Sequence, residues 1–392
     1  MRLRKDGTVS LHGIDKPLLI TALTLLVYGS VMVFSASAPY ALSNHGDALY
    51  YAKRQIVFAS LGVGGMLGCA ALPWEKHRKY TMPIGFAVSA VLLVAVLFNG
   101  GAIKRWISLG PVSIQPSELM KPMLIMLIAA YMDKNQAEIK KNGIYKIGAF
   151  YRTGDKKAFW RSSVRGVFIP IGIVFSVCLM IMLENHFSGT LITFCIGAIV
   201  IFAGGAMLRW FVGAGAVACA AVFTVLFGTD YASERIDIWL HPESFSVTDE
   251  TWQITQGLIA IGSGGIFGTG LGNGMQKQLF VSAAHNDFIF SIVCEELGLI
   301  GAVLLIALFF IFSARGIHLA GECDGLFSSL CAVGISCHVA LQAFLNIGVV
   351  TATVPNTGVT LPFFSYGGSA LIVLLCEVGI LLSVTKKGRK TV

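Results

Sequence analysis

Ten long apolar segments constrain this chain more than any other feature. A helix that spans a bilayer needs about 20 predominantly apolar residues, within a range of about 17–25. We place such segments at 17–37, 55–72, 80–99, 116–132, 166–183, 187–206, 210–228, 288–314, 325–350 and 366–385. The chain is therefore predicted to be an all-α polytopic membrane protein. We expect about ten transmembrane helices within a single transmembrane domain that covers residues 1–392.

The composition excludes the other broad classes of protein. Of the 392 residues, 55% are hydrophobic and 13% are charged, about half of the roughly 25% usual in soluble domains. A soluble globular protein would need more polar surface, and a disordered chain would be less apolar. The nine cysteines are scattered through apolar segments without a C-x-x-C pair, so they predict neither a disulfide framework nor a zinc site.

The distribution of positive charge predicts the orientation of the chain in the membrane. With the N-terminus placed inside, 22 of the 29 Lys and Arg residues fall on the inner side of the predicted helices. Such an excess favours the cytoplasmic side, so both termini are predicted to be cytoplasmic. The formal net charge of +8 is explained in this way without a nucleic-acid partner. A large outer loop, at about 229–287, separates the seventh and eighth helices, and most of its charged residues are acidic.

The fourth apolar segment begins with ionisable residues, which are costly at membrane depth and mark candidate functional sites. Pro116 suits the first position of a helix, and Glu118 then lies in the first turn, where the helix dipole favours an anion. Lys121 follows at i+3, so it shares a face with Glu118 and can pair with it. A helix cap with a local ion pair is an equally supported interpretation of these residues.

Arg105 and Trp106 lie just before this helix, at the outer side. The guanidinium fork of an arginine suits a phosphate group, so Arg105 is a candidate phosphate ligand. Trp106 has two interpretations, as part of the site or as an aromatic residue at the membrane interface.

Asp287 lies where the outer loop enters the eighth helix. It could cap that helix by accepting backbone N–H bonds, or it could be a general base at the mouth of a membrane cavity, and the sequence supports both interpretations equally. Glu295 and Glu296 lie deeper in the same helix, and we expect them to form structural pairs inside the bundle.

Two outer segments and one glycine-rich segment complete the set of unusual features. The turn at 184–190 is polar. The loop at 355–369 carries no charge, and its Gly and Pro residues predict a turn that lines a cavity. The glycine-rich segment 262–274 lacks the βαβ context of a dinucleotide site. It is interpreted as turns that could form a nest of N–H groups for an anion.

Several motifs in one order resemble the SEDS family (shape, elongation, division and sporulation), which includes FtsW, RodA and SpoVE. The resemblance extends over almost the whole chain. The motifs are RWISLG (105–110), QPSELMK (115–121), IAIGSGGIFGTGLGNGMQK (259–277), HNDFIFSIVCEELG (285–298) and LPFFSYGGSA (361–370). The segment LYYAKRQ (49–55) is similar to the division and sporulation branch rather than to the elongation branch.

The resemblance implies a peptidoglycan glycosyltransferase of the bacterial cytoplasmic membrane. Such enzymes polymerise lipid II into glycan strands at the outer face and work with a class B penicillin-binding protein. Asp287 occupies the position of the essential catalytic Asp, and Trp106 and Glu118 fall on positions implicated in activity. The candidate substrate-binding residues are Arg105, Trp106, Glu118, Lys121, Arg235, His285, Ser365 and Gly367.

The chain departs from the family pattern in two places. Asn286 stands where the family usually has Thr, and the turn often written Q-P-D-x-G-T reads Glu184-Asn185-His186-Phe187-Ser188-Gly189. Asn286 keeps the capacity for hydrogen bonding. The altered turn changes the side chains available for contacts with a substrate.

The expected reaction transfers a lipid-linked glycan onto lipid II, and both partners keep their polyprenyl tails in the membrane lipid. Asp287 would accept the proton of the attacking sugar hydroxyl. Arg105, with Lys121 or Arg235, would stabilise the departing diphosphate. A divalent cation, Mg²⁺ or Mn²⁺, could assist, although the sequence predicts no dedicated metal site. Two alternatives stay open at this point: a lipid II flippase, and a non-catalytic scaffold that activates a penicillin-binding protein.

Overall fold

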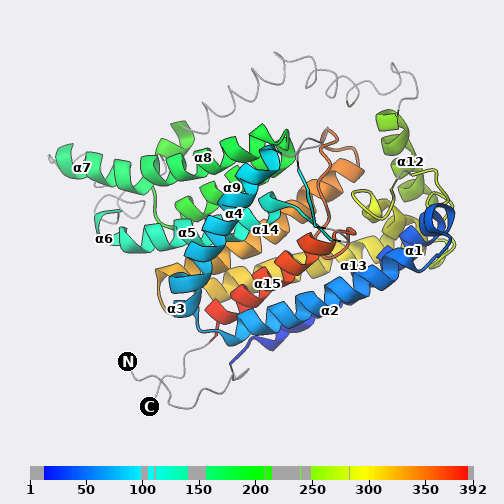
Figure 1. The fold of residues 1–392 in the computed structure, drawn as a ribbon, viewed down its shortest axis with the longest axis horizontal. Helices are drawn as coiled ribbons and strands as arrows, with labels where there is room; N and C mark the ends of the chain where they lie inside the picture. The colour runs from blue at the N-terminus through cyan, green and yellow to red at the C-terminus, as the bar shows by residue number, and fades with distance from the viewer. Residues whose placement is uncertain are drawn as a thin grey trace.

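The computed structural model describes residues 13–98, 105–109, 112–139, 156–207, 209–213, 239, 249–281 and 283–386. In this part of the chain, long helices lie side by side in one bundle (Figure 1). The first half contains α1 (Lys16–His45), α2 (Tyr50–Ala71), α3 (Trp74–Lys76), the π-helix η1 (His77–Thr81), α4 (Met82–Leu97), α5 (Pro116–Lys134) and α6 (Gln136–Ile139). The second half contains α7 (Lys156–Ser163), the π-helix η4 (Val164–Phe168), α8 (Ile169–Leu183), α9 (Phe187–Ala203), α12 (Asp249–Ser263), α13 (Ile289–Ala320), α14 (Leu326–Val350) and α15 (Gly368–Val384).

The helices follow the apolar segments of the sequence closely. Within the described residues, six helical stretches are long and apolar enough to cross a membrane, and α9 and α15 are shorter apolar helices. Nine of the ten predicted segments coincide with a helix, and most of the tenth, at 210–228, lies outside the described residues. The described residues are mostly helical, in agreement with the prediction of an all-α fold, and they add one short pair of strands. Strands β1 (Ile107–Leu109) and β2 (Val112–Ile114) form a small antiparallel pair before α5.

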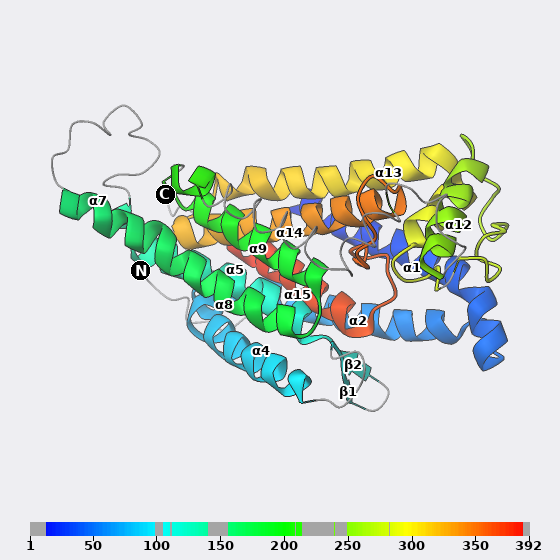
Figure 2. The ribbon, with the colours of Figure 1, turned by 90° about the horizontal axis from the view of Figure 1, so that it is seen from above.

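Two ion pairs join basic residues to the helices at one end of the bundle. Arg315, near the end of α13, bonds to Asp15, which caps α1, with 2.7 Å between Nη2 and Oδ2. Arg78 bonds to Asp133 near the end of α5, with 2.6 Å between Nη1 and Oδ2. All of these basic residues belong to segments that the charge distribution assigned to a single side of the membrane. Helix α12 lies at the opposite end of the bundle, steeply inclined to α13 (Figures 1 and 2).

Helix α13 is broken at Gly298, whose backbone adopts φ 66° and ψ −164°. This positive φ is a conformation that glycine adopts readily. The break frees backbone groups on both sides, and the glycine-rich segment 264–270 satisfies them. The amides of Thr269 and Gly270 donate to the carbonyls of Glu295 and Glu296 at 2.9 and 3.0 Å, and the amides of 299 and 300 donate to the carbonyls of 265 and 266. In the structure the glycine-rich segment therefore serves as a strap that completes a broken helix.

The predicted pairing is present for Glu296, while Glu295 bonds to backbone amides. The carboxylate of Glu295 accepts hydrogen bonds from the amides of Met275 and Gln276, at 2.6 and 3.0 Å to Oε1. Glu296 accepts a bond of 2.6 Å from Nζ of Lys277 and a bond of 2.6 Å from the hydroxyl of Ser35. All of these partners come from α1 and from residues 275–277, which follow the strap, so both carboxylates fix the outer loop to the bundle.

The loop between α14 and α15 packs into the bundle against α1. Gly29 of α1 touches it so closely that a Cβ at this position would lie 2.2 Å from the carbonyl oxygen of Phe363. Phe363 and Phe364 are fully buried. The close approach of α1 thus holds in place a loop that lines the cavity described below.

We predict that Gly29→Ala destabilises the protein by about 1–3 kcal/mol, because the added methyl group overpacks this contact. Gly64→Ala in α2 is the matched control, since a Cβ there would meet nothing within 4 Å. Thermal unfolding of the purified protein in detergent should show a lower midpoint for the first variant and an unchanged or higher midpoint for the second. Equal midpoints for both variants would contradict the packing described here.

Candidate active site

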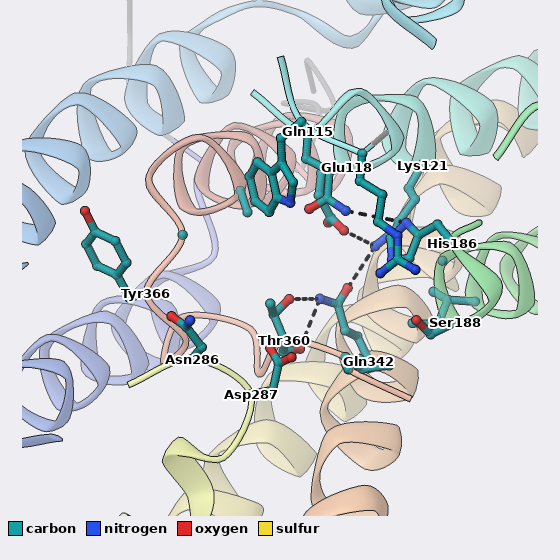
Figure 3. A pocket seen from close by; sticks show the side chains of 18 residues that line it. Gln115, Glu118, Lys121, His186, Ser188, Asn286, Asp287, Gln342, Thr360 and Tyr366 are labelled. Atoms are coloured by element: carbon teal, nitrogen blue, oxygen red, sulfur yellow. Dashed lines mark hydrogen bonds and ion pairs between the residues drawn. The ribbon is translucent and has the colours of Figure 1, made fainter. Parts of the chain in front are cut away.

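A cavity of about 210 Å³ lies between the beginnings of α5, α9 and α15, the loop before α15 and the segment before α13. Its side chains come from distant parts of the sequence and converge on one space (Figure 3). Polar side chains dominate its lining. Those used below are Arg105, Trp106, Gln115, Glu118, Lys121, His186, Asn286, Asp287, Gln342 and Thr360.

An ion pair on the first turn of α5 forms one side of the cavity. Nζ of Lys121 lies 2.7 Å from Oε1 of Glu118 and donates a further bond of 3.3 Å to Oε1 of Gln342 on α14. The side chain of Lys121 is only 1% exposed, and that of Glu118 is 13% exposed. The predicted pairing within α5 is therefore present. The pair also belongs to the cavity wall, so it is more than a helix cap.

Asp287 faces the cavity from the segment that leads into α13 (Figure 3). It does not cap that helix, because the N-cap position belongs to Phe288 and no side chain bonds there. Its backbone carbonyl accepts a bond of 2.7 Å from Nδ2 of Asn346, which also donates to the carbonyl of Val359 at 2.6 Å. A Cβ on Gly358 would lie 3.4 Å from Oδ2 of Asp287, so the loop before α15 passes directly beside the carboxylate.

Burial raises the pKa of Asp287 to about 6, and the positive charge of Arg105 opposes this rise. Desolvation disfavours the charged form of a carboxyl group, whereas a nearby cation favours it. A carboxyl group with a pKa near 6 is mostly ionised at neutral pH and can still take up a proton readily. This is the property that a general base requires.

Two hydrogen bonds bind the loop before α15 to the segment around Asp287, and a third, between Leu361 and Ser365, closes the loop on itself. The hydroxyl of Ser365 donates to the carbonyl of Asn286 at 2.8 Å and accepts from the amide of Leu361 at 2.7 Å. The amide of Tyr366 donates to the carbonyl of His285 at 2.9 Å. The hydroxyl of Ser365, a predicted substrate contact, therefore bonds to backbone groups, and Ser365 lies outside the main cavity wall. Gly367, another predicted substrate contact, does line the cavity.

The ring of His285, another predicted substrate contact, also lies outside the cavity wall. It packs among Tyr40, Tyr51 and Tyr366, with ring centroids 5.2, 4.6 and 5.9 Å away. Burial lowers the pKa of His285 to about 4, so the ring is neutral at neutral pH. In this position the His285 ring packs against aromatic side chains instead of lining the cavity.

Arg105 reaches the cavity from the segment before β1 and bonds to the turn between α8 and α9. Its guanidinium donates to the carbonyl of Asn185. The neighbouring Glu184 is buried, and burial raises its pKa to about 8 although Arg105 opposes the shift. Glu184 is therefore mostly protonated at neutral pH, which leaves the charge of Arg105 available to the cavity. Arg235, also a predicted substrate contact, lies outside the described residues.

The polar turn at 184–190, which the sequence analysis noted, also contributes to the cavity. His186 lines the cavity, and its Nδ1 lies 3.4 Å from both Nε2 of Gln115 and the hydroxyl of Ser117. Burial lowers the pKa of His186 to about 4, so it is a neutral group at neutral pH. Gln342 and Thr360 also line the cavity. Thr360 belongs to the loop at 355–369, which the sequence predicted to line a cavity, whereas Gln342, a neutral amide within an apolar segment, gave no signal that could have identified it.

The described residues contain no cluster of three or more His, Cys, Asp or Glu side chains that could hold a metal ion. Of the two carboxylates that line the cavity, Glu118 is already bonded to Lys121. A divalent cation would therefore have Asp287 as its only charged protein ligand among the described cavity residues, and the chain's own cations are the groups suited to an anionic substrate.

Comparison with known proteins shows similarity over almost the whole chain. A sequence model for cell cycle proteins of the FtsW, RodA and SpoVE type matches residues 16–390. A probable peptidoglycan glycosyltransferase FtsW of Geobacter sulfurreducens is 37% identical over 378 residues, which cover 95% of each chain. Stage V sporulation protein E of Bacillus subtilis is 38% identical over 386 residues, which cover 96% of this chain and 98% of that protein.

Solved structures extend the similarity to the fold. The rod shape determining protein RodA of Thermus thermophilus superposes with a TM-score of 0.66 at 25% identity, over 96% of this chain and 99% of RodA. A chain of a peptidoglycan synthase complex, solved to explain how polymerization and crosslinking are coordinated, superposes with a TM-score of 0.74 at 25% identity. That match covers 97% of this chain and 99% of the other.

We predict that Lys121→Met lowers the free energy of unfolding by about 3 kcal/mol or more, because it leaves Glu118 as an uncompensated charge. Lys53→Met is the matched control, since Lys53 pairs with Asp47 at 2.8 Å on the exposed surface. Breaking that pair should cost less than about 1 kcal/mol. Chemical denaturation in detergent provides the measurement, and similar losses for the two variants would refute a buried pair on the cavity wall.

Proposed function

Because this chain belongs to the cell cycle protein family of FtsW, RodA and SpoVE, we propose that it is a peptidoglycan glycosyltransferase that polymerises lipid II. Family membership and the six long apolar helices make it a multi-pass integral membrane protein. The observation that carries the proposal is the shared cavity, where the carboxylate of Asp287 faces the same space as Arg105 and Lys121. A base and a pair of cations are what a glycosyl transfer from a diphosphate donor requires.

In the proposed reaction, a sugar hydroxyl of lipid II attacks the anomeric carbon of the lipid-linked glycan. The hydroxyl proton passes to Asp287 as the new glycosidic bond forms, and the bond from the anomeric carbon to the diphosphate oxygen breaks. The electron pair leaves with the polyprenyl diphosphate. In-line attack inverts the anomeric centre, so an α-linked donor yields a β-linked strand. Anchoring both polyprenyl tails in the bilayer removes part of the entropic cost of bringing the two reactants together.

The cations of the cavity stabilise the charge that develops on the leaving diphosphate. Arg105 presents a guanidinium fork, which suits phosphate oxygens, and Glu184 beside it is mostly neutral. Lys121 supplies a second cationic donor from α5; its charge is shared with Glu118, and Gln342 holds its position. Trp106 and Gly367 line the same space, where they would contact the sugar rings. A divalent cation would add charge neutralisation at the diphosphate, but no step here depends on one.

The proposal includes the arrangement in the cell. We infer ten spans, both termini in the cytoplasm, and a catalytic cavity that opens toward the outer face of the bacterial cytoplasmic membrane. The grouping of basic segments at the end opposite α12 supports this orientation. The similarity to a chain of a peptidoglycan synthase complex supports a partner that cross-links the product, and a class B penicillin-binding protein is the partner we propose.

The break in α13 is the feature that a flippase would share, because transporters often bind substrates at discontinuous helices. Here the strap pairs with the backbone groups beside the break, so they are not available to a substrate. A scaffold without activity would not need a carboxylate beside two cations. Transfer of lipid II across liposome membranes without polymer formation would favour the first alternative over the polymerase.

We predict that Asp287→Ala abolishes polymerisation of lipid II by the purified protein while the protein stays folded, because the proton of the attacking hydroxyl loses its acceptor. The matched control is Asp47→Ala, which removes an exposed carboxylate between α1 and α2. Gel analysis of labelled lipid II, with and without a penicillin-binding protein, provides the measurement. Substantial polymer formation by Asp287→Ala would remove this residue from the proposed role.

We also predict that activity rises with pH around an apparent pKa of about 6, since only the ionised form of Asp287 can accept the proton. Below this value activity should fall about tenfold per pH unit. Arg105→Gln should move the midpoint to higher pH, because the positive charge of Arg105 lowers the pKa of Asp287. Initial rates measured across this range for both proteins provide the test. A flat profile, or a midpoint that moves to lower pH, would contradict the proposed base.

A further inference from the structure

Behind the cavity, α14 and α15 share a buried pair that takes no direct part in the proposed reaction. Nδ1 of His338 lies 2.9 and 3.0 Å from the two carboxylate oxygens of Glu377. Their side chains are 3% and 1% exposed. Neither residue lines the main cavity. The other ring nitrogen of His338, Nε2, lies 2.9 Å from Oε1 of Gln342, and Gln342 does line it.

The orientation of the Gln342 amide follows from its partners. Its nitrogen lies 3.2 Å from the backbone carbonyl oxygen of Thr360 and 3.0 Å from the hydroxyl of the same residue. A carbonyl oxygen can only accept a hydrogen bond, so the group that faces it must be the NH₂. The oxygen of the amide must then face Lys121 and His338. Lys121 confirms this orientation, because an ammonium group can only donate.

The protonation of His338 follows in turn. Since Oε1 of Gln342 can only accept, Nε2 of His338 must carry a hydrogen. Nδ1 and the carboxylate of Glu377 then share one further proton, because two acceptors 2.9 Å apart would repel each other. The pair therefore holds two protons in all and is neutral as a unit. This charge state allows it to be buried without an uncompensated charge.

We propose, on the basis of the function proposed above, that His338 and Glu377 are positioning residues for glycosyl transfer. Glu377 fixes the proton arrangement of His338, and His338 fixes the amide of Gln342. Gln342 then holds two parts of the cavity wall at once: Lys121 on α5, which faces the diphosphate, and Thr360 on the loop that passes beside Asp287.

The space around Gln342 makes such an anchor necessary. A small cavity of about 30 Å³, large enough for a water molecule, adjoins His338, Gln342, Thr360 and Glu377. An amide released by His338 has room to turn or to take water as a partner. Lys121 would then lose one of its two bonding partners. The loop beside Asp287 would lose the bonds that Thr360 receives from α14.

Two variants of Glu377 test the proposal. In Glu377→Gln, the new amide can donate to Nδ1, and the neutral imidazole keeps its hydrogen on Nε2. This variant should therefore retain the rate of lipid II polymerisation within about threefold. Glu377→Leu removes the partner of Nδ1 and should lower kcat about tenfold or more, the loss expected when a buried hydrogen-bonding unit is broken. Ser336→Ala on α14, which changes a buried hydroxyl outside the network, is the matched control and should leave the rate unchanged.

A double variant separates positioning from stability. His338→Leu with Glu377→Leu replaces the pair by apolar side chains, which should recover most of the melting temperature that Glu377→Leu loses. The rate should stay low, because Gln342 remains without its anchor. If the double variant recovers both the melting temperature and the rate, the pair is only structural and the proposal is wrong. Wild-type rates for Glu377→Leu would also overturn it.

The protonation itself is measured independently of activity. NMR of protein labelled with ¹⁵N-histidine should show a hydrogen on Nε2 of His338 in the wild type and in Glu377→Gln. A bare Nε2 in the wild type would overturn the proposal even if lipid II is polymerised. If the wild type polymerises no lipid II but Nε2 carries the hydrogen, the proposed function fails while the predicted network stands.

Discussion

The side-chain amide of Asn346 is the contact on which the cavity depends. It is fully buried in α14, and its Nδ2 donates to the carbonyls of both Asp287 and Val359. These carbonyls belong to two non-helical segments, one before α13 and one before α15, which are separated in the sequence by α13 and α14. Backbone outside a helix is tolerated at membrane depth only when protein or water satisfies its polar groups. One amide thus fixes the carboxylate of Asp287 relative to the loop that passes beside it.

The same requirement accounts for the rest of the outer half of the bundle. At Gly298 the broken helix α13 recovers its hydrogen bonds from the glycine-rich strap, and Glu295 and Glu296 bond to residues 275–277 just after that strap. In the cavity, two opposing effects set the pKa of the catalytic candidate Asp287. Burial raises the pKa of Asp287 while Arg105 limits the rise, so a single environment yields a carboxylate able to accept a proton beside cations able to bind a diphosphate.

The sequence predicted the helices well because long apolar segments have few alternatives in a membrane. It also brought Asp287, Arg105, Trp106, Glu118 and Lys121 into one hypothesis, through chemistry and through family resemblance, and the structure places all five around one cavity. It did not reveal the break at Gly298, because a single glycine within an apolar segment resembles any other. It did not reveal the role of His338, Gln342 and Glu377, since their protonation and orientation depend on three-dimensional partners. His285 and Ser365 were predicted as substrate contacts from their motifs, but they face tyrosines and backbone groups.

A structure of the protein with a bound lipid II analogue would show whether the cavity holds the two substrates of the transfer. We expect the acceptor sugar in the cavity with a hydroxyl within hydrogen-bonding distance of Asp287, and the diphosphate of the donor against Arg105 and Lys121. We also expect the polyprenyl chain to leave the cavity toward the lipid. An analogue bound elsewhere on the bundle, with Asp287 more than one water molecule away from any sugar hydroxyl, would contradict the account.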